Sequence, residues 1–183
     1  MADNFEKDDV LKDLGINKPK EILQVKYGGI SLTPGQELTP TQVKDQPEIT
    51  WSADPNSLYA LFFHDPDAPS REDNHVGDVQ HWSVINIPSN NIQKGDVRAE
   101  FFGSGPPKGS GLHRYVFLVF KQPSRIPLDG PVKPKTSVEG RIKQKIPLIV
   151  QEFNLEGPIA ANYYNSQYDD YVPTLHKQIG FNP

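Results

Sequence analysis

Glycine and proline are the residues that most restrict how this chain can fold. The 183 residues include 14 glycines and 18 prolines, and both types interrupt helices, because glycine is too flexible and proline lacks an amide hydrogen. They separate short runs that are rich in β-branched and aromatic residues, as β-strands are. These runs are EILQVKY (21–27), EITW (48–51), SLYALFF (57–63), HWSVINI (81–87), VRAEFF (97–102) and HRYVFLVF (113–120). The sequence therefore predicts a mainly β fold rather than a helical bundle.

Further patterns refine the expected arrangement of strands. In residues 115–120 the apolar character is continuous rather than alternating, which indicates a strand covered on both faces. We therefore expect two packed layers. The short runs ISL and QEL flank Thr33, Pro34 and Gly35, a composition that favours a tight hairpin turn. Residues 158–166 are predicted to form one more strand.

Three segments combine apolar side chains at helical spacing with the glycine or proline signals of a helix end. These segments are residues 4–14, 147–155 and 169–180. The last one begins with two aspartates and has Gly180 as its expected C-cap. Because no repeat, low-complexity tract or linker divides the chain, we expect one domain over residues 1–183. Residues 1–20 are expected to form an N-terminal extension with a short helix.

The composition excludes several kinds of site. The sequence has no cysteine, so disulfides, thiolate nucleophiles and zinc-thiolate sites are impossible. The net charge of -4 opposes attraction of nucleic acid by the overall field. The N-terminus lacks the apolar region of a signal peptide, and no run approaches the ~20 apolar residues of a membrane span. We expect a cytoplasmic monomer with no cofactor, no metal, no nucleic-acid partner and no transmembrane segment.

A cluster of basic residues lies in the second half of the chain. Its members fall within residues 131–145 and are Lys133, Lys135, Arg141, Lys143 and Lys145. We interpret them as solvated side chains on a loop and on the approach to a helix.

The segment DPDAPSR, residues 65–71, directly follows an apolar strand and restricts the backbone more than a turn requires. Its two prolines hold the residues before them in extended conformations, so the loop is expected to be stiff. A stiff loop after a strand can hold polar groups in fixed positions. The carboxylate of Asp67 could cap the amides of its own loop or point into a site, and either X-Pro bond could be cis.

The segment GSGPPKGSGLHRY, residues 103–115, is rich in glycine but matches neither of two common motifs. Lys108 precedes Gly109, which is the wrong order for a P-loop. Ser104 does not lie in Gly-x-Ser-x-Gly, so an α/β-hydrolase nucleophile is unsupported. What remains is that glycines let backbone N–H groups approach a ligand closely, and successive amides can form an anion-binding nest.

Two histidines begin apolar strands beside these loops. They are His81 and His113, and each alone would most often be a structural residue. If the two strands meet, imidazolium charge and amide donors would together neutralise a phosphate or carboxylate without a metal. A carboxylate such as Asp67 in the same pocket would oppose a bare anion and favour a zwitterion. The residues therefore point toward a head group that carries both phosphate and ammonium.

These motifs together resemble the phosphatidylethanolamine-binding protein family, whose animal members include the Raf kinase inhibitor protein. DPDAPSR, the glycine segment with HRYVFLVF, LTPTQV with EITW, and YDDYVPTLH occur in the family's order over residues 21–180. The resemblance implies a central antiparallel β-fold of two sheets, short flanking helices including a C-terminal one, and a small anion pocket with Pro69 in the cis form. The ligand-binding residues that it implies are Asp67, Ala68, Pro69, His81, Gly103, Gly105, Pro106, His113 and Tyr115.

One position departs from the family's pattern. Members commonly have Glu-Trp shortly before the histidine that matches His81, whereas this chain reads GDVQHW, with Val79 in the aromatic position. Trp82 cannot replace the missing ring, because adjacent strand residues face opposite ways. The C-terminal helix is expected to cover the opening in part, with His176 and Ile179 as the nearest contributors.

The resemblance implies a non-enzymatic, soluble protein that binds phosphate-bearing small ligands or phospholipid head groups and acts through protein partners. The first hypothesis for that action is inhibition of a kinase cascade by masking a Raf-type kinase, with Lys108 and Arg114 recognising phosphorylated acidic segments. A second is inhibition of a serine protease. A third is hydrolysis of a small molecule, because an Asp-His-His group can act as general acid and base.

Overall fold

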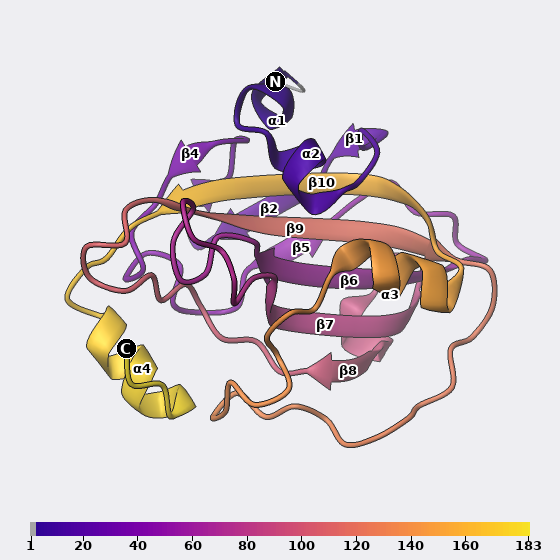
Figure 1. The fold of residues 1–183 in the computed structure, drawn as a ribbon. Coiled ribbons are helices and arrows are strands. Elements are labelled where there is room, and N and C mark those ends of the chain that lie inside the picture. The colour runs from indigo at the N-terminus through magenta and orange to yellow at the C-terminus, as the bar shows by residue number, and fades with distance from the viewer. Residues whose placement is uncertain (1–2) are drawn as a thin grey trace.

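The computed structural model describes residues 3–183, and its largest element is a seven-stranded sheet (Figure 1). Five strands are antiparallel neighbours in the order β10, β9, β6, β7 and β8, and two short strands, β1 and β4, add to β10 in parallel. The strands are β1 (Glu21–Ile22), β4 (Gln36–Glu37), β6 (Leu58–Asp65), β7 (Val79–Pro88), β8 (Asp96–Ala99), β9 (His113–Gln122) and β10 (Glu156–Ser166). The predicted antiparallel centre of the fold is confirmed.

A second, three-stranded sheet packs on one face of the large sheet. Its strands, in spatial order, are β3 (Ile30–Ser31), β2 (Gln24–Tyr27) and β5 (Glu48–Thr50). Buried apolar side chains of both sheets, including Val25, Phe63 and Phe117, form one core between them. Burial extends along almost all of β9, as its continuous apolar sequence predicts. The mainly β, two-layer prediction is therefore confirmed.

Helices cover the opposite face of the large sheet. These are α1 (Asp3–Lys7), α2 (Val10–Leu14) and α3 (Ile146–Phe153), and Figure 1 shows α2 and α3 in front of the strands. The prediction of one helix over residues 4–14 is wrong, because Asp9 has a left-handed backbone with φ of 54° and divides the segment into two helices. Phe5 and Leu14 pack with Phe62 in a second core on this face.

The C-terminal helix α4 (Val172–Ile179) forms as predicted and ends at Gly180, whose φ of 68° is left-handed. It lies at one end of the sheet, apart from the other helices (Figure 1). Asp169 accepts hydrogen bonds from the backbone nitrogen and the hydroxyl of Thr41, at 3.0 and 2.6 Å. The start of the helix is therefore attached to a distant segment of the chain. A short 3-10 helix, Ile92–Lys94, follows β7.

Among residues 3–183, no helix combines the length and the apolar character that crossing a membrane requires.

Two expectations about strands are wrong. The hairpin predicted at Thr33–Gly35 does not form, because β3 pairs with β2 whereas β4 pairs with β10. The backbone nitrogen of Gly35 instead donates to the carbonyl of Tyr163, so this segment follows β10. The strand predicted over residues 97–102 ends at Ala99. Beyond it, the Phe102 nitrogen donates to the carbonyl of His81, which places the following glycine segment beside β7.

Candidate functional site

A cavity of about 350 Å³ lies where β6 ends and where β7 and β9 begin, beside α4. Seven of the predicted site residues line it: Ala68, Pro69, His81, Gly105, His113, Tyr115 and Ile179. The peptide bond between Ala68 and Pro69 is cis, as the resemblance implies. Segments that are far apart in the sequence therefore meet at one cavity.

Three predicted site residues, Asp67, Gly103 and Pro106, do not line the cavity. Pro107 lines the wall in place of Pro106. At Gly103 a Cβ atom would lie 2.8 Å from the carbonyl oxygen of Val43, so this glycine permits close packing of two backbone segments. Gly103 affects the site indirectly, because its carbonyl oxygen accepts a hydrogen bond from a ring nitrogen of His81 at 2.9 Å.

Asp67 is buried under the cavity wall, where its carboxylate binds Arg114. One oxygen accepts hydrogen bonds from the backbone nitrogen and Nε of Arg114, both at 2.8 Å, and the other accepts from Nη2 at 2.6 Å. Asp67 is 0% exposed. The carboxylate therefore neither caps its own loop nor points into the cavity, and its role is to fix the loop onto β9.

The carboxylate that faces the cavity is that of Asp65, the last residue of β6. Its Oδ2 lies 2.9 Å from Nδ1 of His113, and its Oδ1 accepts a hydrogen bond from the backbone nitrogen of Asp67 at 2.7 Å. On the other side of the ring, Nε2 of His113 lies 2.8 Å from the hydroxyl of Ser110. That hydroxyl donates to the carbonyl oxygen of Pro107 at 2.7 Å.

This chain of hydrogen bonds determines the protonation of His113. A serine hydroxyl has one proton, and a carbonyl oxygen can only accept. The hydroxyl of Ser110 therefore donates its hydrogen bond to the carbonyl oxygen of Pro107 and accepts one from Nε2–H of His113. Both ring nitrogens of His113 then carry protons. Burial opposes this charge, but Asp65 outweighs burial and raises the pKa of His113 above its ordinary 6.5. Burial also raises the pKa of Asp65, but His113 outweighs it and holds that pKa below 3.8.

Ser110, His113 and Asp65 contact one another as the members of a catalytic triad do, but their protons are placed differently. A triad histidine must have a free lone pair on Nε2 to accept the proton of serine. Here the imidazolium has no such lone pair, and the serine proton is directed to a backbone carbonyl. The arrangement produces a buried ion pair rather than an activated nucleophile. Within residues 3–183, no group of three His, Asp or Glu side chains is placed to hold a metal ion.

His81 has the opposite charge state. Its Nδ1 donates to the carbonyl oxygens of Phe102 and Gly103, at 3.2 and 2.9 Å. Burial lowers the pKa of His81 to about 4, and the nearby charge of Arg141 contributes to the same direction. Near neutral pH the ring is therefore uncharged, and its Nε2 offers a lone pair. The imidazolium charge that the sequence analysis invokes is therefore assigned to His113 and not to His81.

Tyr115 supplies a hydroxyl without a partner. This hydroxyl is buried and has no hydrogen-bond partner among residues 3–183, and the ring lines the cavity. Burial raises the pKa of Tyr115 well above 10, and the neighbouring carboxylate of Asp65 adds to this effect, so the hydroxyl keeps its proton. A buried donor without a partner is costly, which makes it a natural contact for a polar ligand.

Helix α4 closes one side of the cavity. The ring of His176 donates from Nε2 to the carbonyl oxygen of Gly105 at 2.8 Å. A Cβ atom at Gly105 would lie 2.9 Å from the side chain of Leu175, so the glycine allows the helix to approach. Both His176 and Ile179 line the cavity, as the sequence analysis expects.

The rest of the wall is apolar. Val79, which occupies the position of the missing aromatic residue, lines the cavity together with Val138, Ile142 and Phe181. Trp82 packs in the core between the sheets, as strand alternation predicts. The sequence analysis did not predict Val138, Ile142 and Phe181 as site residues, because they come from segments without a recognisable motif. It also missed Asp65, although this residue belongs to the same Asp-Pro-Asp motif and ends a strand.

Arg141 is a buried structural residue rather than a solvated member of the basic cluster. It is 0% exposed, and its guanidinium lies 4.5 Å from the ring centroid of Phe102, which lines the cavity. Its Nη2 donates to the carbonyl oxygens of Lys133 and Pro134, at 3.0 and 2.7 Å. The solvated interpretation is therefore wrong for this residue. Arg141 instead holds the segment that carries Val138 onto the main sheet.

Comparisons with known proteins agree with this architecture. The family model described as phosphatidylethanolamine-binding protein matches residues 18–164. CG7054, known from a solution structure, is 44% identical with a TM-score of 0.74, and the match covers 88% of this chain and 92% of that one.

Two further relatives are a secreted antigen and a proteinase inhibitor. A 26 kDa secreted antigen of Toxocara canis is 42% identical over 135 residues, which are 73% of this chain and 51% of the antigen. The chain thus corresponds to about half of that protein. A carboxypeptidase Y inhibitor, solved in complex with its cognate proteinase, is 25% identical with a TM-score of 0.77, and the match covers 92% of this chain and 95% of that one.

Proposed function

Because the chain belongs to the phosphatidylethanolamine-binding protein family, we propose that it is a soluble protein that binds phosphate-bearing small ligands or phospholipid head groups. The observation that carries the proposal is the unpartnered hydroxyl of Tyr115 inside a cavity of about 350 Å³. The adjacent pair of Asp65 and His113 has no net charge, which suits a zwitterion such as phosphoethanolamine better than a bare dianion. The volume suits a head group rather than a diacyl lipid.

The proposed contacts are those of the predicted residues that line the cavity, with one addition. They are Ala68, Pro69, His81, Gly105, His113, Tyr115 and Ile179, to which we add Asp65. In this assignment Tyr115 donates to the phosphoryl oxygens and Asp65 faces the ammonium group. Asp67, Gly103 and Pro106 support the wall and do not touch the ligand.

Binding of an anionic ligand is expected to tighten several-fold as the pH falls from 8 to 6. Neutral His81 presents a lone pair at Nε2, which repels an anion, whereas protonated His81 donates a hydrogen bond. The anion therefore raises the pKa of His81 from about 4, and binding takes up protons. Calorimetry with ethanolamine O-sulfate, in buffers of different ionisation heat, measures this uptake, because the sulfate itself does not titrate in this range.

Two variants make the pH measurement specific. His81→Gln should bind with little pH dependence, whereas His75→Gln should behave like the parent protein, because His75 is exposed and pairs with exposed Asp73. Equal pH dependence in all three proteins would contradict the assignment to His81.

We also propose that the protein binds without turnover. Phosphorus NMR with phosphoethanolamine checks this, since a growing inorganic phosphate signal would reveal hydrolysis.

We propose that the protein acts through protein partners by masking a Raf-type kinase. Lys108 is exposed, with its ammonium 5.7 Å from the ring centroid of Tyr168, and can meet a phosphorylated segment. Arg114, expected to share this task, is 1% exposed and unavailable to a partner. A pull-down with phosphorylated and unphosphorylated kinase peptides tests the proposal. Loss of phosphopeptide binding in Lys108→Met would support it, and absence of binding to either peptide would end it.

Inhibition of a serine protease is the alternative. The similarity to the carboxypeptidase Y inhibitor favours it, at 25% identity over 92% of this chain. Titration of the protein into carboxypeptidase Y distinguishes the two proposals.

We further propose a cytoplasmic monomer, because the chain contains no cysteine that an oxidising compartment would pair. Cell fractionation and size-exclusion chromatography test these two points.

A further inference from the structure

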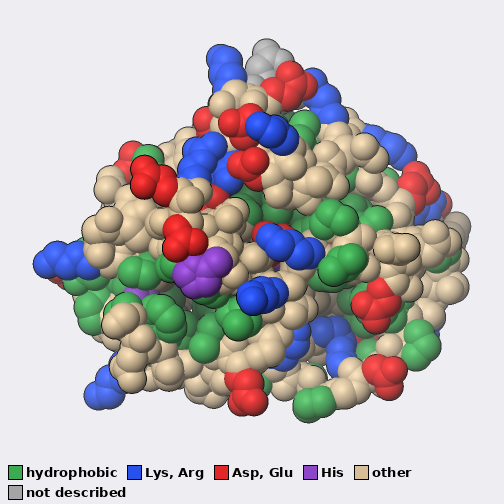
Figure 2. All heavy atoms as spheres, viewed as in Figure 1, with side chains coloured by type: hydrophobic (Ala, Val, Ile, Leu, Met, Phe, Trp, Pro, Cys, Tyr) green, Lys and Arg blue, Asp and Glu red, His purple; other side chains and the backbone are tan. Residues whose placement is uncertain are grey.

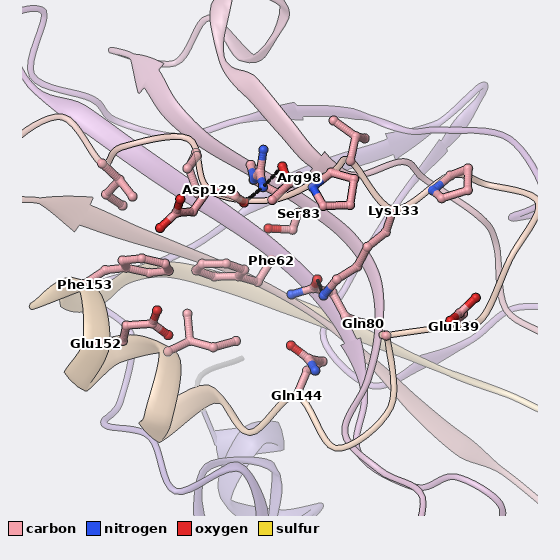
Figure 3. Close-up of a pocket in the computed structure, with 18 of the residues that line it drawn as sticks. Phe62, Gln80, Ser83, Arg98, Asp129, Lys133, Glu139, Gln144, Glu152 and Phe153 are labelled. Atoms are coloured by element: carbon pink, nitrogen blue, oxygen red, sulfur yellow. Dashed lines mark hydrogen bonds between the residues drawn. The ribbon is translucent and has the colours of Figure 1, made fainter.

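A second cavity, of about 770 Å³, lies on the face of the large sheet that carries the helices. It is bounded by β6, β7 and β8, by α3, and by the long segment between β9 and α3 (Figure 1 and Figure 3). It shares no lining residue with the first cavity. The segment 133–142 separates them: Val138 and Ile142 line the first cavity, whereas Ser137 and Gly140 line the second.

The floor of this second cavity is apolar. Its apolar lining includes Phe62, Ile85, Ile126, Ile149 and Phe153. Phe62 and Ile85 are nearly buried, at 2% and 3% exposure, whereas Phe153 is only half-buried. Phe153 packs against the core cluster that contains Phe62, and Figure 3 shows both rings in the lining of the cavity. An apolar surface of this size, open to water, favours a ligand with an apolar body.

Lys133 introduces a positive charge into this cavity. Its ammonium donates to Oε1 of Gln80 at 3.3 Å, and Figure 3 shows the two side chains directed toward one another. Among residues 3–183, Lys133 forms no salt bridge. Gln80 is itself fixed, because its amide nitrogen lies 3.3 Å from Nε2 of buried His64. One ammonium proton is therefore used, and the others remain for a ligand.

Arg98, which also lines the cavity, and Arg141, which lies outside its lining, are engaged by backbone carbonyls. Arg98 donates to the carbonyl oxygens of Asp129 and Gly130, and Arg141 donates to those of Lys133 and Pro134. Carbonyl oxygens do not neutralise their charge. Burial lowers the pKa of Lys133, and Arg141 and Arg98 add to this effect. Figure 2 shows Lys and Arg side chains near the middle of this face beside hydrophobic ones.

We propose that this second cavity binds a small amphipathic carboxylate, with its carboxylate on the ammonium of Lys133 and its apolar body against Phe62 and Phe153. A cationic group placed beside Lys133 would be repelled by its ammonium, and Arg98 lies in the same lining. A highly charged anion would meet carboxylates in the same lining, from Asp129, Glu139 and Glu152. A single negative charge placed at Lys133, followed by an apolar chain, satisfies both conditions. The proposal does not depend on the function of the first cavity.

The test uses octanoate and 1-octanol as probes, both below the concentrations at which they aggregate. Because a hydrogen bond to a charged group is worth more than one to a neutral group, octanoate should bind about tenfold more tightly than 1-octanol. Backbone amide signals of Gln80, Ser83 and Phe153 should shift in two-dimensional NMR spectra. This comparison needs only the unaltered protein. Equal affinity for the two probes would overturn the proposal.

Variants then assign the preference to one side chain. Lys133→Met should abolish the preference for octanoate, and Lys133→Arg should largely retain it. Lys135→Met is the matched control, because this exposed lysine lies two residues away and outside the lining. An unchanged preference in Lys133→Met, or shifts confined to residues of the first cavity such as Val79 and Ile179, would also overturn the proposal.

Discussion

Asp67→Asn is expected to lower the free energy of unfolding by about 3 kcal/mol, because removing one partner of a buried ion pair leaves an uncompensated charge. Asparagine has nearly the same size, but its amide group would face the guanidinium of Arg114 in place of the carboxylate. Asp13 remains 2.8 Å from that guanidinium but is exposed to solvent. It compensates only in part, since Asp67 accepts three of the hydrogen bonds of Arg114. Urea unfolding followed by circular dichroism measures the loss.

Asp73→Asn is the matched control for this change. Asp73 lies in the same loop region, but its side chain is 70% exposed and its partner His75 is also exposed. Surface ion pairs contribute little to stability, so this variant should unfold at nearly the same urea concentration as the parent. If Asp67→Asn unfolded there too, the ion pair with Arg114 would not hold the loop, and the structural role assigned to Asp67 would fail.

The second large effect is a loss of stability at acid pH, caused by two buried neutral histidines. Burial lowers the pKa of His64 to about 3 and that of His81 to about 4, whereas both titrate near 6.5 when unfolded. Below that value the unfolded chain takes up protons and the folded chain does not. Lowering the pH from 7 to 5 should therefore cost about 2 kcal/mol for each ring, or about 4 kcal/mol in total.

His113 changes stability in the opposite sense. Its pKa is raised in the folded state, so its stabilisation is fully present below pH 6.5 and is lost as the pH rises through the raised value. Its contribution can only reduce the acid loss near neutral pH. Asp65, with a lowered pKa, keeps its stabilisation until the pH falls below 3.8. The window from pH 6.5 to 4 therefore reports mainly on His64 and His81.

Urea unfolding at pH 7 and pH 5 measures the acid loss. His64→Gln should remove about half of this acid loss, because the variant lacks one of the two imidazoles that stay unprotonated in the folded state. His75→Gln, at an exposed position, should leave the difference unchanged. A parent protein that is equally stable at both pH values would show that the two rings are not held neutral.

Much of the candidate site could be predicted from local motifs. Seven of the residues that the family resemblance and the C-terminal helix suggest line one cavity: six lie in DPDAPSR, the glycine segment or the starts of two strands, and Ile179 lies in α4. The choice between Asp65 and Asp67 could not be predicted in this way. Both carboxylates occur in the same short motif and both are buried, and only the position of Arg114 on β9 decides which one is held away from the cavity.

The amino-acid sequence by itself determined the mainly β architecture and the stop of α4 at Gly180, because these depend on local backbone preferences and on side-chain periodicity. It also indicated the family, through the resemblance of its motifs. Tertiary structure alone decided which imidazole is charged. His81 and His113 begin similar strands, but one ring meets backbone carbonyls and the other meets Asp65. It also decided that Lys133 lies over an apolar floor without a salt bridge among residues 3–183. Charge and burial depend on neighbours brought from distant parts of the chain, which no local pattern records.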